Sequence, residues 1–271
     1  MSINLQGKNI LVMGVTNKFS LGWAIAEVAR DAGANLAFSY QAERQQATLQ
    51  KLTADIGNCR LYQCDVTDED QLRSMMADLG EAWGGLDGIV HAIGFAPRPA
   101  MEGRYLDTSK EDWLLALEVS AYSLLAVARE SETILNEGAG IVTLTYYAAE
   151  KVVPKYNVMG IAKSALESTV RYLAYDLGKK GVRVNAVSAG PVKTVAARSI
   201  PGFMQMYGKF SSMAPLSRGI EPADVGNLGV FLMSPMAAGI TGETVYVDAG
   251  YHVMGMDLPD QEEPSGGASA E

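Results

Sequence analysis

The sequence predicts an α/β fold in which helices cover both faces of a parallel sheet of seven strands, the doubly wound arrangement. Short apolar runs of strand length alternate along the chain with longer segments of helical periodicity. Glycines are frequent, 28 in 271 residues, and suit the many tight turns that such a fold needs. Because parallel neighbours need a crossover connection, the alternation predicts parallel strands joined by right-handed helical crossovers.

The first strand is expected at residues 9–12 and the first helix at residues 21–32. The turn between them reads GVTNKFSLG, with Gly14, Ser20 and Gly22 where the backbone turns sharply or approaches something closely. Free N–H groups and the positive end of the helix dipole meet there, so the pyrophosphate of a dinucleotide is a natural ligand. The spacing is not GxGxxG, and an ordinary strand-to-helix connection is the alternative.

The second strand is expected at residues 35–40 and leads directly into Gln41. In dinucleotide folds an acid at this strand end often holds the adenosine ribose hydroxyls, whereas basic residues favour a 2′-phosphate. Gln41 can hydrogen-bond a ribose hydroxyl without adding charge, which indicates NADH. Arg44, three residues further on, keeps NADPH open.

A helix at residues 42–55 and a third strand at residues 60–63 come next, and Asp65 and Val66 follow that strand. An aspartate there can accept a hydrogen bond from the adenine amino group, while the next backbone N–H meets a ring nitrogen. A turn or N-cap aspartate is the alternative reading of Asp65.

A helix at residues 68–83 precedes a buried strand at residues 88–92, which runs into Ile93 and Gly94. A glycine at that point allows close approach of a flat ligand. His91 lies inside the apolar run, and we interpret it as a packed core histidine rather than a catalyst.

The second half of the chain continues the alternation of helices and strands. One long helix is expected within residues 109–135 and further helices at residues 156–177 and 222–233, and strands are expected at residues 140–145, 182–188 and 244–248. In open parallel sheets, ligands bind at the carboxyl ends of the strands. The polar and glycine residues singled out above lie at such ends or beside them.

Tyr156 and Lys163 are seven residues apart at the start of an expected helix, so both project from one face, two turns apart. A phenol with its reference pKa of about 10 is a poor acid at neutral pH, but a nearby ammonium favours the phenolate and eases proton donation. This spacing suits joint chemistry. Alone, the same pair also arises by chance on the solvated face of a long helix.

After the sixth strand the chain reads SAGPVKT, in which Val192 and Thr194 could pack and hydrogen-bond against a nicotinamide. An apolar, Met-rich patch that contains Phe203 and Met206 follows. This patch suits a mobile lid over an oily substrate, so we expect a substrate-binding loop near residues 192–215. A short core helix is the alternative reading of the patch.

Composition fits one large domain over residues 1–256, because 48% of the residues are hydrophobic and 20% are charged. Residues 257–271 contain five acids, no bases and little to bury, so we expect this acidic tail to be disordered.

The formal charge of −9 argues against a nucleic-acid partner and against a polybasic membrane patch. The N-terminus lacks the apolar stretch of a signal peptide, and no run approaches a membrane span. Cys59 and Cys64 are too few and too close for a disulfide framework, and with only His91 and His252 no metal site is expected. A reducing cytoplasm is the simplest setting.

Together these motifs resemble the short-chain dehydrogenase/reductase superfamily up to about residue 256, and within it the NADH-dependent enoyl-acyl-carrier-protein reductases of bacterial type II fatty-acid synthesis. The resemblance rests on the glycine turn, the IGFA stretch at residues 93–96, the pair Tyr146 and Tyr156 with Lys163, SAGPVKT, and TGETVYVDAG near the end. Ordinary members have a serine where Thr143 stands; Tyr146 marks the divergent pattern of enoyl reductases.

The resemblance implies a Rossmann-type reductase domain and a role for particular residues. Tyr156, Lys163 and Tyr146 match catalytic positions, with Tyr146 in a supporting role. Gly14, Ser20, Leu21, Gln41, Asp65, Val66, Ile93, Lys163, Val192 and Thr194 match cofactor positions. Ala96, Tyr146, Tyr156, Met159, Phe203 and Met206 are the expected substrate contacts.

The reaction implied is hydride transfer from NADH to the trans-2 double bond of an enoyl thioester on acyl-carrier protein, with Tyr156 stabilising the enolate and Lys163 holding the nicotinamide ribose. The family also implies a homotetramer. A 3-oxoacyl thioester reductase of the same superfamily and a non-catalytic dinucleotide-binding protein are the alternatives.

Overall fold

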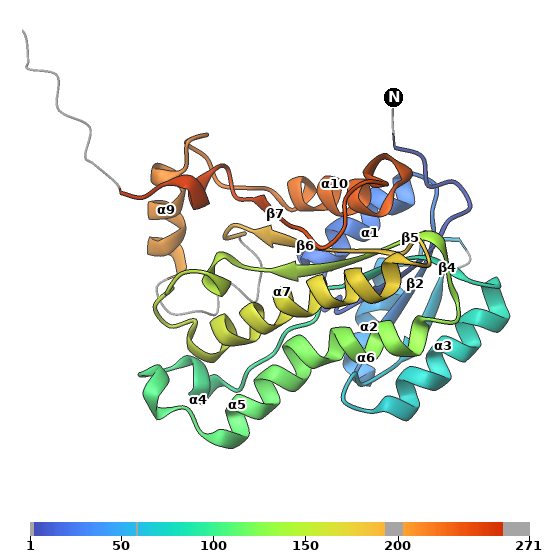
Figure 1. The fold of residues 1–271 in the computed structure, drawn as a ribbon, viewed down its shortest axis with the longest axis horizontal. Coiled ribbons are helices and arrows are strands. Elements are labelled where there is room, and N and C mark those ends of the chain that lie inside the picture. The colour runs from blue at the N-terminus through green and yellow to red at the C-terminus, as the bar shows by residue number, and fades with distance from the viewer. Residues whose placement is uncertain (1–2, 58, 193–202, 257–271) are drawn as a thin grey trace, which may run out of the picture.

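The computed structural model describes residues 3–57, 59–192 and 203–256. Its strands form one all-parallel sheet in the order β3-β2-β1-β4-β5-β6-β7 (Figure 1), which confirms the predicted doubly wound fold. The strands are β1 (Asn9–Met13), β2 (Asn35–Tyr40), β3 (Arg60–Gln63), β4 (Leu86–His91), β5 (Leu135–Thr145), β6 (Arg183–Ala189) and β7 (Thr244–Val247). The chain reverses its direction of travel across the sheet between β1 and β4, and ligands of such folds bind at this switch point.

At least one helix lies between each pair of consecutive strands, and short helical turns accompany several of these helices. The longer helices are α1 (Leu21–Asp31), α2 (Glu43–Leu52), α3 (Glu69–Trp83), α5 (Lys110–Leu117), α6 (Ser123–Ser131), α7 (Asn157–Gly178), α9 (Phe203–Met213) and α10 (Pro222–Met233). The shorter elements are α4 (Arg98–Met101), a π-helical turn η2 (Glu118–Tyr122), and the 3₁₀ turns η1 (Tyr105–Asp107), η3 (Tyr147–Ala149), η4 (Pro235–Ala237) and η5 (Tyr251–Val253).

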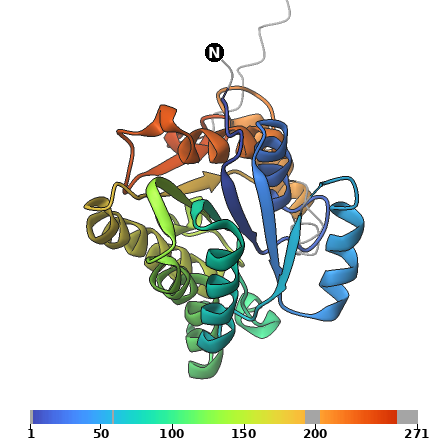
Figure 2. The same cartoon turned by 90° about the vertical axis from the view of Figure 1, so that its right-hand side faces the viewer.

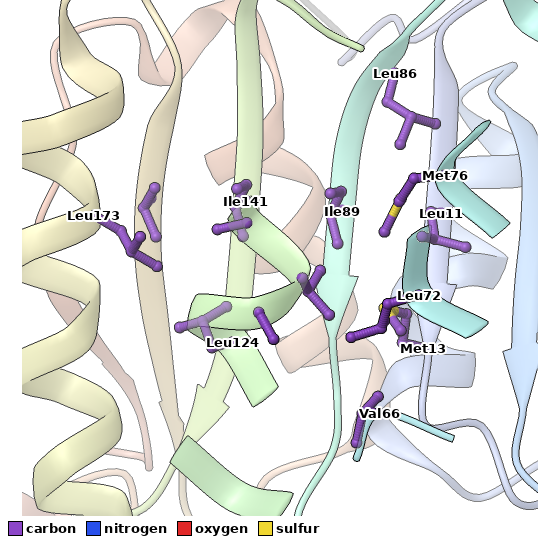
Figure 3. Close-up of a cluster of buried hydrophobic side chains, with 14 of the residues drawn as sticks. Leu11, Met13, Val66, Leu72, Met76, Leu86, Ile89, Leu124, Ile141 and Leu173 are labelled. Carbon is purple, nitrogen blue, oxygen red and sulfur yellow. The ribbon is translucent and has the colours of Figure 1, made fainter. Parts of the chain in front are cut away.

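The core lies in two layers, one on each face of the sheet. Neighbouring residues of a strand point to opposite faces, so Leu11 and Met13 join one cluster while Ile10 and Val12 join the other. The first cluster packs against α3, α6 and α7 (Figure 3), and the second packs against α1, α2 and α10. Figures 1 and 2 show α1 and α10 on the side of the sheet opposite α6 and α7. Burial on both faces explains the almost continuous apolar strands.

Local sequence signals set the ends of α3. The Asp68 carboxylate accepts hydrogen bonds from the backbone N–H groups of Asp70 and Gln71, at 3.0 and 3.1 Å, and so caps the helix. Gly84 ends it with φ of +73°, a left-handed conformation that favours glycine. The expected helix at residues 68–83 is therefore confirmed, with its first residue acting as the cap.

The segment at residues 109–135, which was expected to contain one long helix, is helical over residues 110–131. Its helical part is interrupted by η2 and ends at Ser131, because Leu135 instead pairs with Leu86 of β4 and begins β5. The patch after residue 202 forms the helix α9 over its described part. Within the described residues, no helix combines the length and apolar character needed to cross a bilayer.

Candidate active site

A pocket of about 390 Å³ opens at the carboxyl ends of β1, β4, β5 and β6. Its walls come from the segments that follow these four strands and from the start of α7. The residues predicted for the site that line it are Gly14, Ser20, Leu21, Ile93, Tyr146, Tyr156, Met159, Lys163 and Val192. The structure thus brings most of the predicted site together at the switch point of the sheet.

Tyr156 and Lys163 project into this pocket from the first turns of α7, as their spacing predicts. The ring of Tyr146, which directly follows β5, meets the ring of Tyr156 edge-on, with centroids 5.0 Å apart. Lys155 and Asn157 flank Tyr156 with φ of +66° and +38°. Such left-handed conformations are costly for residues other than glycine, so surrounding contacts must hold this short stretch in place.

The pKa of Tyr156 is raised above its usual value, first by burial and then by the neighbouring Tyr146. Burial also raises the pKa of Tyr146 to about 12. The phenol is therefore not made more acidic, contrary to the expectation for a nearby Lys163, because loss of hydration disfavours the phenolate. At neutral pH both phenols keep their protons and can therefore donate a hydrogen bond to a ligand.

Lys163 is 6% exposed and donates a hydrogen bond of 2.8 Å to the carbonyl oxygen of Leu144. Burial lowers its pKa to about 8, and the negative charge of Glu167 opposes that shift. The side chain is therefore largely charged at neutral pH. An ammonium carries three N–H donors, and Leu144 uses one, so others can reach a ligand in the pocket.

The turn after β1 approaches the end of β4 closely. Gly14 has φ of +91°, and a Cβ there would lie 2.2 Å from the carbonyl oxygen of Ala92. Ser20 accepts hydrogen bonds of 3.1 Å from the backbone N–H groups of Thr16 and Asn17, which closes the turn at the start of α1. This turn therefore has a packing requirement of its own and also presents backbone to the pocket.

Gln41 and Asp65 follow adjacent strands of the sheet, β2 and β3, and meet beyond the strand ends. The side-chain amide of Gln41 donates to the Asp65 carboxylate at 2.8 Å, and the backbone N–H and hydroxyl of Thr67 donate to the same carboxylate. These hydrogen bonds lower the pKa of Asp65 despite partial burial, so it stays ionised. The two polar side chains that were expected to bind the adenosine part of the cofactor are thus in direct contact with each other.

Not every predicted site residue lies on the pocket wall. The Val66 side chain belongs to the core cluster shown in Figure 3, and Ala96 packs against the small apolar cluster of Ala100, Ala116 and Val158. Thr194, and residues 193–202 of the loop expected near residues 192–215, lie outside the described residues. Phe203 and Met206 belong to α9, but their side chains are not among the described parts of the structure.

His91 is fully buried, in agreement with its interpretation as a core residue. Its ring nitrogens lie 3.0 Å from the Thr143 hydroxyl and 2.9 Å from the Ser123 hydroxyl. Burial, with a contribution from Lys163, lowers its pKa to about 3, so the ring is neutral at pH 7. Thr143 is engaged with His91 in the core, so it does not supply the hydroxyl that ordinary superfamily members place beside the tyrosine.

Sequence reasoning missed Ser120, which lies in the π-helical turn η2. Its hydroxyl accepts from the backbone N–H of Phe95 and donates to the carbonyl oxygen of Phe95, both at 2.9 Å, and it lies 3.6 Å from the Met159 sulfur. It therefore fastens the segment after β4 to α7. A single serine in an apolar helical run gives no signal of such a role; the π turn, which is frequent at functional sites, becomes visible only in the fold.

The residues present fit an elongated dinucleotide. Glycines leave two walls of the pocket without side chains, at Gly14 and at Gly94, where a Cβ would already lie 3.4 Å from the Lys163 nitrogen. The pair Gln41 and Asp65, after β2 and β3, offers a donor and an acceptor outside the pocket lining, and Lys163 offers donors within it. In the described parts of the chain, no group of three His, Cys, Asp or Glu is arranged to hold a metal ion.

A seven-stranded parallel sheet of this order, with a tyrosine and a lysine seven residues apart at the start of the helix after β5, is the architecture of short-chain dehydrogenase/reductase proteins, and the chain is of that class. A family model described as "Enoyl-(Acyl carrier protein) reductase" matches residues 14–252.

The relatives and solved structures agree with that family. An enoyl-[acyl-carrier-protein] reductase [NADH] of Rickettsia typhi is 45% identical over 251 residues, which cover 93% of this chain and 96% of the relative. The Bacillus cereus enoyl-acyl-carrier-protein reductase, solved with NADP+ and indole naphthyridinone, is 42% identical with a TM-score of 0.92, covering 94% of this chain and 100% of that one. The Anaplasma phagocytophilum reductase, solved with NAD, is 42% identical with a TM-score of 0.91, covering 95% and 100%.

The chain therefore belongs to the enoyl-acyl-carrier-protein reductase family.

Proposed function

We propose that this chain reduces the trans-2 double bond of enoyl thioesters borne by acyl-carrier protein, with NADH as the reductant and Tyr156 as the main catalytic residue. Membership in the family makes the chain an oxidoreductase of fatty-acid synthesis. The observation that carries the assignment of roles is the shared pocket of Tyr156, Lys163 and the turn at Gly14.

NADH, when bound, supplies a hydride to the β-carbon of the enoyl thioester. The electron pair of the double bond then moves towards the α-carbon and the thioester oxygen, which becomes an enolate oxygen. Tyr156 donates a hydrogen bond to that oxygen, and a preorganised donor in a dry site stabilises such a charge more than it stabilises the neutral ground state. The raised pKa of Tyr156 suits this role, because the phenol keeps its proton until charge develops.

Lys163 acts as a positioning and electrostatic residue in this proposal. Its ammonium is buried beside the pocket, tied to the Leu144 carbonyl, and has donors for the hydroxyls of a ribose. Tyr146 supports Tyr156 by edge-on ring packing. One proton must reach the α-carbon to complete the reduction, and we assign a part in that supply to Tyr146, which keeps its proton at neutral pH.

We assign the remaining predicted cofactor contacts to residues along the carboxyl edge of the sheet. Gly14, Ser20 and Leu21 would hold the pyrophosphate, while Ile93 and Val192 would contact the nicotinamide side of the pocket. Gln41 and Asp65 would hold the ribose hydroxyls and the adenine, with the Val66 backbone beside them. NADH is favoured over NADPH because the ionised Asp65, bonded to Gln41, would repel a 2′-phosphate.

The substrate contacts are proposed at Met159, which lines the pocket, and at Ala96, in the segment after β4. Phe203, Met206 and Thr194 complete the set, within a loop near residues 192–215 of a single domain spanning residues 1–256, with the acidic tail at 257–271 outside it. We propose a cytoplasmic homotetramer as the working form. Apolar side chains such as Leu114, Tyr172 and Tyr175, each at least half exposed, offer surface for contacts between copies.

A direct test compares two thioesters with NADH and the purified protein. Crotonyl and acetoacetyl thioesters differ in whether hydride adds to a carbon–carbon double bond or to a ketone. We expect NADH oxidation with the crotonyl substrate and little with the acetoacetyl substrate, because Thr143 is turned into the core and cannot assist a ketone. Reduction of acetoacetyl thioester alone would support the 3-oxoacyl reductase, and NADH binding without turnover of either would support a non-catalytic protein.

A further inference from the structure

Glu167 is a buried carboxylate to which the proposed reaction gives no task. It lies on α7 one helical turn beyond Lys163, is 8% exposed, and accepts a hydrogen bond of 2.7 Å from the Thr145 hydroxyl. Acids are seldom buried to this extent unless they are paired. Since the described residues give Glu167 no salt bridge within 4.0 Å, its charge must be compensated over a longer distance.

Two consecutive residues at the end of β5 hold two successive turns of α7. The carbonyl oxygen of Leu144 accepts from Lys163, and the hydroxyl of Thr145 donates to Glu167. The next residue along the chain is Tyr146, which packs on Tyr156 at the start of the same helix. The strand end that delivers one tyrosine is thus fastened to the helix that delivers the other tyrosine and the lysine.

The electrostatic surroundings of Glu167 favour action on Lys163. Burial raises the pKa of Glu167 above its usual value, and Glu150, from the segment after η3, raises it further. The Thr145 hydroxyl of β5 and, on α7, the exposed Arg171 and Lys163 act in the opposite direction and favour the ionised form. The charge of Glu167 in turn raises the pKa of Tyr246 on β7. The effect is mutual, because the carboxylate of Glu167 raises the pKa of Lys163 against the larger effect of burial.

We propose that Glu167 is a positioning residue that keeps the Lys163 ammonium charged and in place for the cofactor ribose. The proposal rests on the proposed function, in which Lys163 binds that ribose. Of the two cations near Glu167, only Lys163 lines the pocket, whereas Arg171 is exposed to water, so loss of the Glu167 charge would affect the cofactor site through the lysine. Removing the carboxylate charge while keeping the side-chain shape should let Lys163 lose its proton at a lower pH.

The test measures the NADH dissociation constant across pH 6 to 10, by NADH fluorescence and with no thioester present. In the wild-type protein the affinity should fall as pH rises through the pKa of Lys163, which is about 8. Glu167→Gln should move the midpoint of that fall down by about one pH unit, the shift expected for losing one nearby opposite charge. At pH 6, where Lys163 is charged in both proteins, their NADH affinities should agree closely.

Matched variants separate charge from shape. Thr145→Val removes the hydrogen bond but keeps the carboxylate, so the midpoint should stay near the wild-type value. Glu167→Asp also keeps a carboxylate, so its midpoint should likewise lie near the wild-type value rather than at that of Glu167→Gln. Thermal melting of each variant reports on folding independently. The proposal is overturned if Glu167→Gln leaves the midpoint in place, or if Thr145→Val moves it equally. Lys163→Ala tests the proposed function separately, because unchanged NADH affinity in that variant would show that Lys163 does not bind the cofactor ribose.

Discussion

Lys163 is buried and Tyr156 is partly buried in the folded chain, and desolvation moves their pKa values in opposite directions. The phenol becomes a weaker acid, and the ammonium becomes more acidic, with its pKa lowered to about 8. Both groups nevertheless keep their protons at neutral pH. The pocket therefore presents two donors, a neutral one and a charged one, which suits the stabilisation of a developing oxyanion.

Coenzyme choice is a second question at the residue scale, and it turns on Gln41 and Asp65. In the wild-type protein, NADH should support faster turnover than NADPH at equal concentrations, because the Asp65 carboxylate lies beside Gln41. Gln41→Arg would neutralise that charge and offer a partner for a 2′-phosphate. We expect it to raise the NADPH-to-NADH ratio of kcat/KM by about tenfold, equivalent to about 1.4 kcal/mol.

Arg44→Ala is the matched control for this prediction, because Arg44 is the base that the sequence left as an NADPH contact. Its ratio should stay at the wild-type value. A wild-type preference for NADPH that disappears in Arg44→Ala would reverse the assignment and make Arg44 the residue that selects the coenzyme.

At the scale of elements, the site depends on how closely α7 approaches the segment after β5. A Cβ at Gly160 would lie 2.9 Å from the carbonyl oxygen of Ala148, and Ser164 on the next turn donates to the carbonyl oxygen of Ala149. Small side chains on this face of α7 therefore set the distance between the helix and Tyr146. A larger residue would push apart the two elements that carry the tyrosines.

Gly160→Ala should lower kcat by about tenfold or more, because displacement of α7 moves Tyr156 away from its working position. Steady-state kinetics with the crotonyl thioester and thermal melting provide the measurement. Gly178→Ala, at the far end of α7, meets nothing within 4 Å and should leave kcat unchanged while keeping or slightly raising stability. Equal kinetics for the two variants would show that the close contact at Gly160 has no catalytic consequence.

The order and type of the elements followed from the sequence because periodicity and turn residues are local signals. The β2, β3 and α10 bounds agree with the predicted ranges, and the strand end at Thr145 was placed correctly. What the sequence left hidden depends on tertiary contact. Leu135 belongs to β5 because it pairs with Leu86 of β4, a contact that the local sequence does not reveal.

The same distinction applies to the candidate site. Tyr156, Lys163 and Gly14 were recognisable from residue type and spacing, and all three line the pocket. Ser120 and Glu167 were not, because each acts through a neighbour that is distant in sequence. Burial also reversed the expected direction of the Tyr156 pKa, since a sequence shows which charges are near along a helix but not how much water is lost.

For the molecule as a whole, the buried neutral histidine between β4, β5 and α6 links folding to pH. The folded pKa of His91 is about 3, against its usual value of 6.5, so the unfolded chain binds a proton that the folded chain rejects between these values. Stability from this source is complete above pH 6.5 and is lost as the pH falls towards 3. By pH 4 the loss should reach about 3 kcal/mol.

Urea unfolding between pH 7 and pH 4 measures this effect, with His91→Asn as the comparison. The asparagine amide can bond to Thr143 or Ser123 but does not titrate, so the variant should be less stable at pH 7 yet lose less stability on acidification. Parallel acid dependence in the two proteins would mean that carboxylates alone account for the loss.

The hydrogen bond from the Tyr156 phenol to the enolate oxygen is the central interaction of the proposed mechanism. The decisive measurement is the rate of hydride transfer in a single turnover, followed by the loss of NADH absorbance with saturating crotonyl thioester, in wild type and Tyr156→Phe. We predict that the variant binds NADH with unchanged affinity and transfers hydride at least about tenfold more slowly, a loss of about 1.4 kcal/mol or more. Hydride transfer at the wild-type rate in Tyr156→Phe would contradict the account.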